Sequence, residues 1–199
     1  MTIALLVALG LLALVALAFI LLRNGMIAMR NQCDEAWSGI DVQLKRRHDL
    51  VPNLVETVKG YATHERRVFE ATAKARAEAM SAGDISGRQE AEARLSGALV
   101  ELRAVAENYP ELRATENFQR LQADLAAIED QLQAARRTYN ADVQAYNTRI
   151  QILPSSIVAR LGGFESRAFF ELETTAEREP ARVSLSVQGP RVNRGVRVC

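Results

Sequence analysis

The chain has 199 residues, which is enough for one membrane anchor and one domain of ordinary size. Its 25 lysines and arginines balance 24 aspartates and glutamates, and this argues against a nucleic-acid-binding protein, which normally carries a net basic field or stripe. Cys33 and Cys199 lie near opposite ends of the chain and define no disulfide framework, so a reducing compartment is the easier assumption.

Residues 3–22 contain neither a charged residue nor a proline. As a helix, this run is about 30 Å long, the thickness of the hydrocarbon core of a bilayer. A cleaved signal peptide is the alternative, but it would have a basic n-region, a shorter apolar run and a small-x-small cleavage site. We therefore expect an uncleaved signal anchor. Arg23 and Arg30 follow the run, so the positive-inside rule predicts the N-terminus outside and the remaining chain in the cytoplasm.

Apolar residues at helical spacing continue beyond the anchor, at Cys33, Trp37, Ile40, Leu44 and Val51. We expect Trp37 to be a core aromatic. Pro52 lacks an amide hydrogen and favours an extended conformation at Val51, so we expect either a kink or a turn there. The apolar stripe resumes at Leu54 and predicts a second helical piece that ends near Met80, with Gly83 as a left-handed cap.

Two further long helices are predicted after this piece. A capping-box pattern at residues 86–89 begins the third, which ends before Pro110. The fourth carries the longest stripe, with apolar steps of three and four over residues 118–153, as in a helical bundle or coiled coil. Because it is longer than the second and third helices, it should project past one end of them. Pro154 ends it, and Ser155 is expected to cap a short last helix.

These elements predict an all-α fold, with an N-terminal transmembrane helix followed by an antiparallel four-helix bundle. The expected domains are a transmembrane anchor in residues 1–23, a cytoplasmic bundle in residues 24–171 and a flexible basic tail in residues 172–199. The tail is assigned from its glycine, proline, arginine and serine content and from the absence of a helical period.

Three stretches resemble the LemA family of bacterial membrane proteins. They are residues 34–65 (DEAWSGIDVQLKRRHDLVPNLVETVKGYATHE), residues 107–121 (ENYPELRATENFQRL) and residues 136–164 (RRTYNADVQAYNTRIQILPSSIVARLGGF). With the anchor, the resemblance covers roughly residues 1–171. It implies a four-helix bundle at the bacterial cytoplasmic (inner) membrane and no established biochemical activity. It also implies an association with membrane metalloproteases of the HtpX type and, through a magnetosome paralogue, with membrane organisation.

The sequence lacks the patterns that carry catalysis or cofactors. A di-iron bundle needs Glu-x-x-His on two helices, but Lys45 stands three residues before His48 and Tyr61 three before His64. Two cysteines and two histidines at single positions give no zinc spacing, and no glycine-rich phosphate loop occurs. We therefore predict no enzyme, no cofactor and no metal site.

A basic run, Lys45-Arg46-Arg47-His48, lies about 30 Å beyond the membrane if the helix is straight. At that distance headgroup charge is screened. We therefore interpret the run as a solvated helix face that pairs with Asp41, Asp49 and Glu56.

The pairs Tyr139-Asn140 and Tyr146-Asn147 lie one heptad apart on the same face of the last long helix. They form either a polar strip for a partner helix or part of the core. We favour the second reading, in which the tyrosines fill the seam and the asparagines satisfy buried backbone or fix register.

A polar cluster is expected at the end of the bundle farthest from the membrane. If the helices alternate in direction, residues 49–53 and 107–116 both lie there. We predict a partner-binding tip formed by Asp49, Asn53, Glu107, Asn108, Tyr109, Glu116 and Asn117. The alternative is that these are ordinary polar turns, in which Asn-Tyr-Pro is common.

The sequence thus predicts a membrane-anchored interaction or scaffold protein, with an adaptor role in membrane-protein quality control or a role in membrane organisation as concrete versions. The expected partners are the membrane and a protein, either a second copy or a membrane protein such as an HtpX-like protease, and no nucleic acid. The alternative is a membrane-bound enzyme with an unrecognised polar site, for instance His64 and Glu65.

Overall fold

A computed structural model describes residues 1–171 as helices joined by short connections, with no strand among them. The all-α prediction with a long apolar N-terminal helix is confirmed for this part of the chain. The predicted tail, residues 172–199, lies outside the described residues. The helices are α1 (Thr2–Lys59), α2 (Arg66–Ser81), α3 (Ile85–Glu107), α4 (Pro110–Arg113), α5 (Glu116–Gln151) and α6 (Ser155–Leu161).

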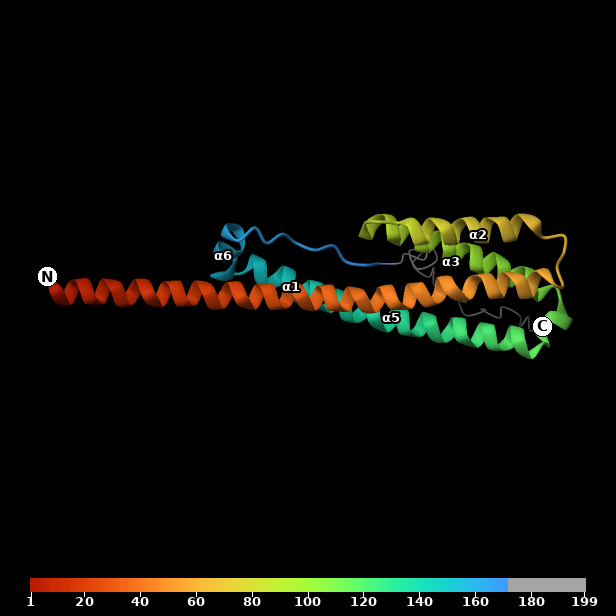
Figure 1. Ribbon diagram of the computed structural model, residues 1–199, viewed down its shortest axis with the longest axis horizontal. Coiled ribbons are helices and arrows are strands. Elements are labelled where there is room, and N and C mark those ends of the chain that lie inside the picture. Colours follow the sequence, from red (N-terminus) through yellow and green to blue (C-terminus); the bar gives the residue numbers. More distant parts are fainter. Residues whose placement is uncertain (172–199) are drawn as a thin grey trace, which may run out of the picture.

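Helix α1 is the longest and most central helix of the described chain. Its 58 residues run without interruption for roughly 87 Å. Its N-terminal part is long and apolar enough to cross a membrane, judged by length and composition, and residues 1–18 are all exposed. Figure 1 shows this part standing alone, whereas the other helices gather around the remainder of α1. We call the end of this helical body next to the apolar run proximal, and the opposite end distal.

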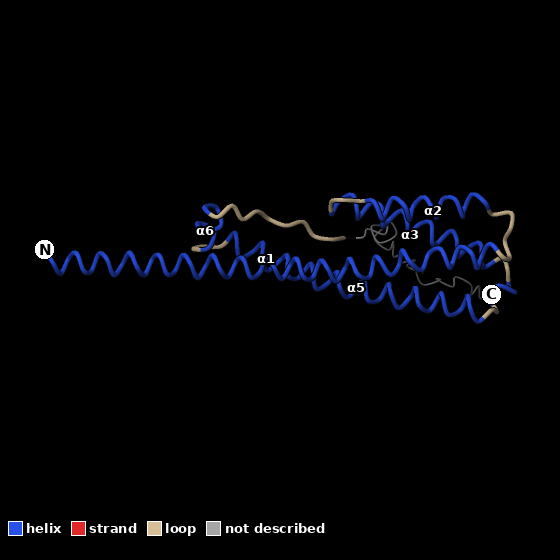
Figure 2. The backbone as a smooth tube through the Cα atoms, viewed as in Figure 1, coloured by secondary structure: helices blue, strands red, loops and turns tan. Residues whose placement is uncertain are grey.

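The long helices run along one axis and alternate in direction (Figure 1). Helix α1 packs mainly against α5, and α2 packs mainly against α3. Helices α2 and α3 cover only the distal part of α1, whereas α5 continues back to α6 beside the apolar run (Figure 2). The longest predicted helix therefore projects past its neighbours, as its sequence indicates.

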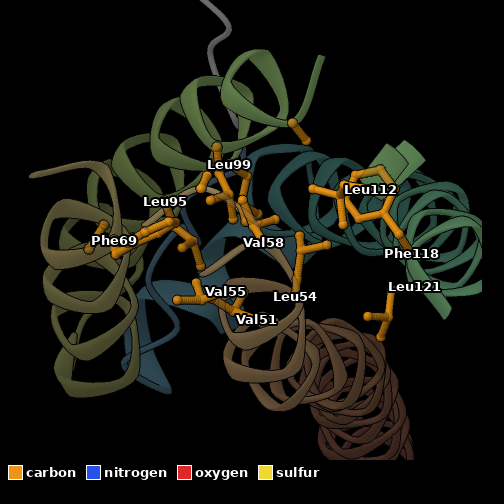
Figure 3. Close-up of a cluster of buried hydrophobic side chains, with 14 of the residues drawn as sticks. Val51, Leu54, Val55, Val58, Phe69, Leu95, Leu99, Leu112, Phe118 and Leu121 are labelled. Carbon is orange, nitrogen blue, oxygen red and sulfur yellow. The ribbon is translucent and has the colours of Figure 1, made fainter. Parts of the chain in front are cut away.

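The distal region has one apolar core to which α1, α2, α3, α4 and α5 all contribute. Apolar side chains at helical spacing from each element meet there because that spacing aligns them on one face. Leu95 and Val58 are completely buried, and each such side chain stabilises the fold by about 1.5–3 kcal/mol. Figure 3 shows ten labelled members: Val51, Leu54, Val55, Val58, Phe69, Leu95, Leu99, Leu112, Phe118 and Leu121.

The proximal region is built from fewer helices. Its core combines residues of α1 and α5 with Phe170, which lies on an extended segment, residues 164–171, after α6 and its closing turn. Half-buried Trp37 packs against this core, with its ring centroid 5.3 Å from that of Tyr139 and 5.2 Å from that of Phe170. The expectation that Trp37 is a core aromatic therefore holds in part, since its side chain is only half-buried.

Pro52 neither ends nor divides the helix, because α1 continues through it to Lys59. The helical break falls eight residues later, in the connection that begins at Gly60. Glycine is a poor helix former, and the adjacent Ala62 turns inward and is fully buried in the distal core. The prediction of one helical piece from residue 54 to residue 80 is therefore wrong.

Three predicted caps also differ from the structure. Ala82, in an extended conformation, follows α2, so Gly83 is not a left-handed cap. The N-cap of α3 is Asp84, whose carboxylate accepts a bond from the Gly87 amide, rather than a residue of the 86–89 pattern. The Ser155 hydroxyl lies 2.7 Å from the Arg149 carbonyl oxygen, so it completes the end of α5 instead of capping α6.

Candidate functional site

Most residues of the predicted tip lie together at the distal end. Glu107 and Asn108 end α3, Tyr109 precedes α4, and Glu116 and Asn117 begin α5. All are exposed except Tyr109, whose ring is half-buried against the distal core. The arrangement places two carboxylates and two amides on an exposed end surface.

A side-chain bond joins this end surface to α1. The Asn117 amide donates to the Thr57 hydroxyl at 3.2 Å, and that hydroxyl donates to the Asn53 carbonyl oxygen at 2.8 Å. Asn53 is thereby connected to the tip. Asp49 is not, because it lines a groove with Met80 at the proximal end of α2. The structure therefore brings six of the seven predicted residues to the distal end and leaves Asp49 apart.

A second polar group is buried between the helices. Arg47 and His48 of α1 are 2% and 7% exposed, and Glu92 of α3 is fully buried. The two oxygens of Glu92 are engaged separately: Oε2 lies 3.2 Å from an Arg47 guanidinium nitrogen, and Oε1 lies 2.6 Å from His48 Nε2. One carboxylate therefore binds two consecutive side chains of α1.

Other helices complete this buried group. Arg47 Nε lies 2.9 Å from a carboxylate oxygen of Glu129 on α5. The remaining guanidinium nitrogen donates to the Ser96 hydroxyl at 2.8 Å, and this hydroxyl donates to the Glu92 carbonyl oxygen. Buried charges are tolerated only when they are paired and hydrogen-bonded. Here two guanidinium nitrogens of Arg47 are hydrogen-bonded, and its Nε has the ion pair with Glu129 without a hydrogen bond of good geometry. Arg47 thus ties α1 to both α3 and α5.

Helix α2 contacts α1 next to this buried group, at a carbonyl that Pro52 leaves without its helical hydrogen bond. Pro52 has no amide hydrogen, so the carbonyl of His48, four residues earlier, loses its helical donor. Arg76 of α2 supplies the missing bond, with its Nε donating to the His48 oxygen at 2.7 Å. This replacement explains how α1 passes Pro52 without ending.

The interpretation of residues 45–48 as a wholly solvated face is therefore wrong for Arg47 and His48, while Lys45 and Arg46 are exposed. A signal for the burial exists in the sequence. The apolar stripe of α1 skips from Leu44 to Val51, and the intervening inward position belongs to Arg47. The stripe does not show which carboxylate pairs with Arg47.

The Tyr-Asn pairs bind the extended segment. Tyr139 and Tyr146 are buried in the proximal core, and burial raises the pKa of both phenols. The Asn147 side-chain amide donates to the Arg167 carbonyl oxygen and accepts from the Arg167 amide, both at 2.9 Å. Asn140 makes the same two bonds with Phe170, at 3.1 and 2.9 Å. The reading in which the asparagines satisfy buried backbone describes these contacts.

The spacing of these contacts follows from chain geometry. Seven residues of helix rise about 10.5 Å, and three residues of extended chain span about 10 Å. Asn140 and Asn147 therefore match Phe170 and Arg167, with the segment antiparallel to α5. The Tyr139 hydroxyl adds a bond to the Ala168 carbonyl at 2.9 Å. The side chains of α5 thus do for this segment what a neighbouring strand does in a sheet.

The residues proposed for acid–base chemistry are not gathered in a pocket. His64 is exposed in the connection between α1 and α2, and Glu65 beside it is half-buried. Neither lines the groove formed by Val42, Leu44, Met80 and neighbouring residues between α1 and α2. In residues 1–171, no three His, Cys, Asp or Glu side chains are placed to hold a metal ion.

Comparison with known proteins gives one family and several relatives. The model of the LemA family matches residues 36–185. Magnetosome protein MamQ 2 of Paramagnetospirillum magneticum is 27% identical over 182 residues, which cover 78% of this chain and 67% of that protein. Magnetosome protein MamQ of Magnetospirillum gryphiswaldense is 26% identical, with 83% and 71% covered. Protein LemA of Metamycoplasma hominis is 21% identical, with 75% and 68% covered.

Proposed function

The chain belongs to the LemA family, and from this premise we propose that it is a non-catalytic, membrane-anchored scaffold that presents its distal tip to a protein partner. The observation that carries the proposal is the continuity of α1. One helix is both the apolar anchor and the central element of the helical body.

Continuity of this kind fixes a distance. From residue 22 to Lys59, α1 rises about 55 Å, and it continues as a helix through Pro52. In our proposal α1, α2, α3 and α5 act as one antiparallel four-helix bundle, supported by their shared distal core and by the buried ion pairs of Arg47. A stiff body of this length sets how far its tip can reach from the bilayer.

The tip offers the chemistry of a protein contact. Exposed Glu107, Asn108, Glu116 and Asn117 provide carboxylates and amides, and Tyr61 adds an exposed ring in the connection after α1. The partner is then a second copy or a membrane protein such as an HtpX-like protease, which would make the chain an adaptor in membrane-protein quality control. The similarity to two magnetosome proteins favours membrane organisation as the broader version of this role.

The orientation of the chain in the membrane is part of the same proposal. We place the chain in the bacterial cytoplasmic membrane as a single-pass protein, with the body in the cytoplasm. The arginines that follow the apolar run, Arg23 and Arg30, support this orientation through the positive-inside rule.

An enzymatic reading has less support. Glu92 is fully buried, and each of its oxygens binds a side chain of α1, so no substrate can reach it in this structure. General acid–base catalysis requires the group to reach the proton that it transfers. We therefore assign the buried cluster to the assembly of the helices.

The proposal is tested by crosslinking the full chain in native membranes and identifying the attached proteins by mass spectrometry. A double variant, Glu107→Arg with Glu116→Arg, reverses the charge of the tip. We expect it to remove the partner crosslinked by the unaltered chain, whether that is a second copy or another membrane protein.

A matched control is available on the same two helices. Glu101→Arg with Asp130→Arg makes the same charge change at exposed positions away from the tip. Crosslinking that survives in this control and disappears in the tip variant supports the proposal. Equal loss in both variants, equal retention in both, or recovery of only uncrosslinked monomer from the unaltered chain contradicts it.

A further inference from the structure

The proximal end of the body carries a concentration of exposed apolar side chains. Beyond residue 22, nine large apolar side chains of the described chain are exposed, and four of them fall within residues 152–161. Of the others, Val42 and Met80 line one groove, and Tyr61, Val100 and Phe169 lie apart from it. The four are Ile152, Leu153, Ile157 and Leu161, which are 45%, 75%, 57% and 74% exposed. We call residues 152–161, which are the connection after α5 and α6 itself, the foot.

The foot lies beside the end of the apolar run. Val158 and Ala159 of α6 are buried against Met26, and Phe19 and Leu22 of α1 pack on the same cluster. Figures 1 and 2 show α6 next to α1 at this level, with the solitary part of α1 on one side and the rest of the body on the other.

The apolar run of α1 is longer than the part of α1 that stands alone. The apolar run extends to residue 22, but α1 stands alone only as far as residue 18. If the whole run is embedded in a bilayer, its last turn carries α6 to the boundary between headgroups and acyl chains. The outer face of α6 then meets lipid, because its inner face is already occupied by α1.

The charges at this end match a phospholipid surface. Residues 1–33 and 143–164 contain no aspartate or glutamate, and their charged side chains are Arg23, Arg30, Arg149 and Arg160. Arginines close to a membrane surface attract anionic headgroups, and apolar residues on the opposite face of a short helix enter the interface. Elsewhere in the described body, residues of both charges occur.

We propose that the foot is a second membrane contact, in which Leu153, Ile157 and Leu161 enter the leaflet on the side of the body and Arg160 meets anionic headgroups. This contact would set the tilt and rotation of the body, which a single spanning helix leaves free. The proposal rests on the anchor described under the proposed function and adds a lipid-binding surface to it.

Fluorescent labels at single cysteines test the proposal in the full chain. In a Cys199→Ser background, Ile157→Cys and Leu161→Cys are labelled with an environment-sensitive fluorophore; the native Cys33 is fully buried. The proteins are reconstituted in vesicles of phosphatidylcholine and phosphatidylglycerol, with or without brominated acyl chains. Leu12→Cys, within the run, is the reference for embedding, and Val100→Cys, an exposed apolar position on distal α3, is the matched control.

We expect brominated lipid to quench both foot labels, to quench the label at position 12 more strongly and to leave that at position 100 unchanged. Foot labels that behave like position 100, while position 12 is quenched, overturn the foot and leave the anchor intact. An unquenched position 12 overturns the anchor and the foot together. Shielding of position 157 that is independent of brominated lipid and accompanied by crosslinks between two copies overturns the lipid contact in favour of self-association.

The charge part of the proposal has its own comparison. Arg160→Gln should reduce the gain in quenching that phosphatidylglycerol gives over phosphatidylcholine alone. Arg103→Gln, at an exposed position on α3, should leave that gain unchanged. Equal quenching of the unaltered foot in both vesicle types overturns the role of the anionic headgroup.

Discussion

The distal and proximal regions enclose their cores in different ways. Distally, α1, α2, α3, α4 and α5 surround an apolar cluster, and Arg47, Glu92 and Glu129 join three of these helices by buried charges. Proximally, α1 and α5 are the two long helices of the described chain that run side by side, and an extended segment bound by Asn140 and Asn147 covers them.

The difference shows what each kind of covering element requires. A helix satisfies its own backbone, so it can cover a core with side chains alone, and charged links are then an addition. An extended segment brings unpaired N–H and C=O groups to the core, and each must find a partner. The primary amide of asparagine has one donor and one acceptor side by side, so a single residue can satisfy both groups of one backbone residue.

Glu92→Leu should cause the largest change, because it leaves His48 without its carboxylate and Arg47 with a single carboxylate, that of the half-buried Glu129. We expect the free energy of unfolding to fall by about 3 kcal/mol. Denaturant unfolding of the full chain in detergent, followed by circular dichroism, measures this. Glu90→Leu, at an exposed position on α3, should change it by less than about 0.5 kcal/mol. Equal midpoints for the two variants would show that the buried charges do not hold the distal region together.

Asn147→Ala should loosen the proximal region and leave the distal region folded. The loss of two bonds to Arg167 leaves both its backbone groups unpaired, at a local cost of about 1–3 kcal/mol. Hydrogen exchange should then accelerate at Arg167 and Phe170, and the emission of Trp37, the only tryptophan, should shift towards the red.

An intermediate variant and a control test the loosening of the proximal region further. Asn147→Asp keeps an acceptor for the Arg167 amide but loses the donor to its carbonyl, so it should be intermediate. Gln144→Ala, on the exposed face of α5, is the control. If exchange accelerates equally in the distal helices of Asn147→Ala, the two regions do not open separately.

Arg76→Met should show whether α2 compensates for Pro52. It removes the donor to the partly buried His48 carbonyl and should lower the free energy of unfolding by about 1 kcal/mol. In a Pro52→Ala background the restored backbone amide takes over that carbonyl, so the same change should have a smaller effect. A double-mutant cycle from denaturant unfolding measures the coupling. Additive effects would rule out the compensation.

Alkaline pH should weaken the proximal region more than the distal one, by the smallest of the four effects. Burial raises the pKa of the Cys33 thiol and of the Tyr139 and Tyr146 phenols, all in the proximal core. The folded state keeps these protons to a higher pH than the unfolded state does. Their contribution to stability is therefore complete below the ordinary values of about 8.5 and 10, and is lost as pH rises through the raised ones.

Trp37 fluorescence and circular dichroism, measured together from neutral to alkaline pH, separate the two regions. The Trp37 signal should change at a lower pH than the helical signal. Tyr139→Phe with Tyr146→Phe should move the Trp37 transition to higher pH, since two titrating groups are removed. Coincident transitions in the unaltered chain would contradict a separate proximal response.

Much of the fold is visible in local patterns of the sequence. The apolar run predicts a membrane-spanning helix, and steps of three and four predict the all-α fold and the length of α5, because both depend on residues close in the chain. The heptad spacing of the Tyr-Asn pairs likewise indicates a shared buried role. Six of the seven tip residues lie together because the alternating direction of the helices follows from their short connections.

Tertiary contacts decided the remainder. Pro52 would end an isolated helix, but Arg76 replaces the bond that it removes, so the break moves to Gly60 and Asp49 lies away from the tip. The burial of Arg47 and His48 depends on Glu92, which lies 44 residues beyond His48 in the chain. The sequence by itself thus determined that the chain is helical and which faces of the helices are apolar, since these depend on neighbouring residues. The tertiary structure decided which polar groups are buried, because a buried charge or carbonyl is tolerated only where folding brings it a partner.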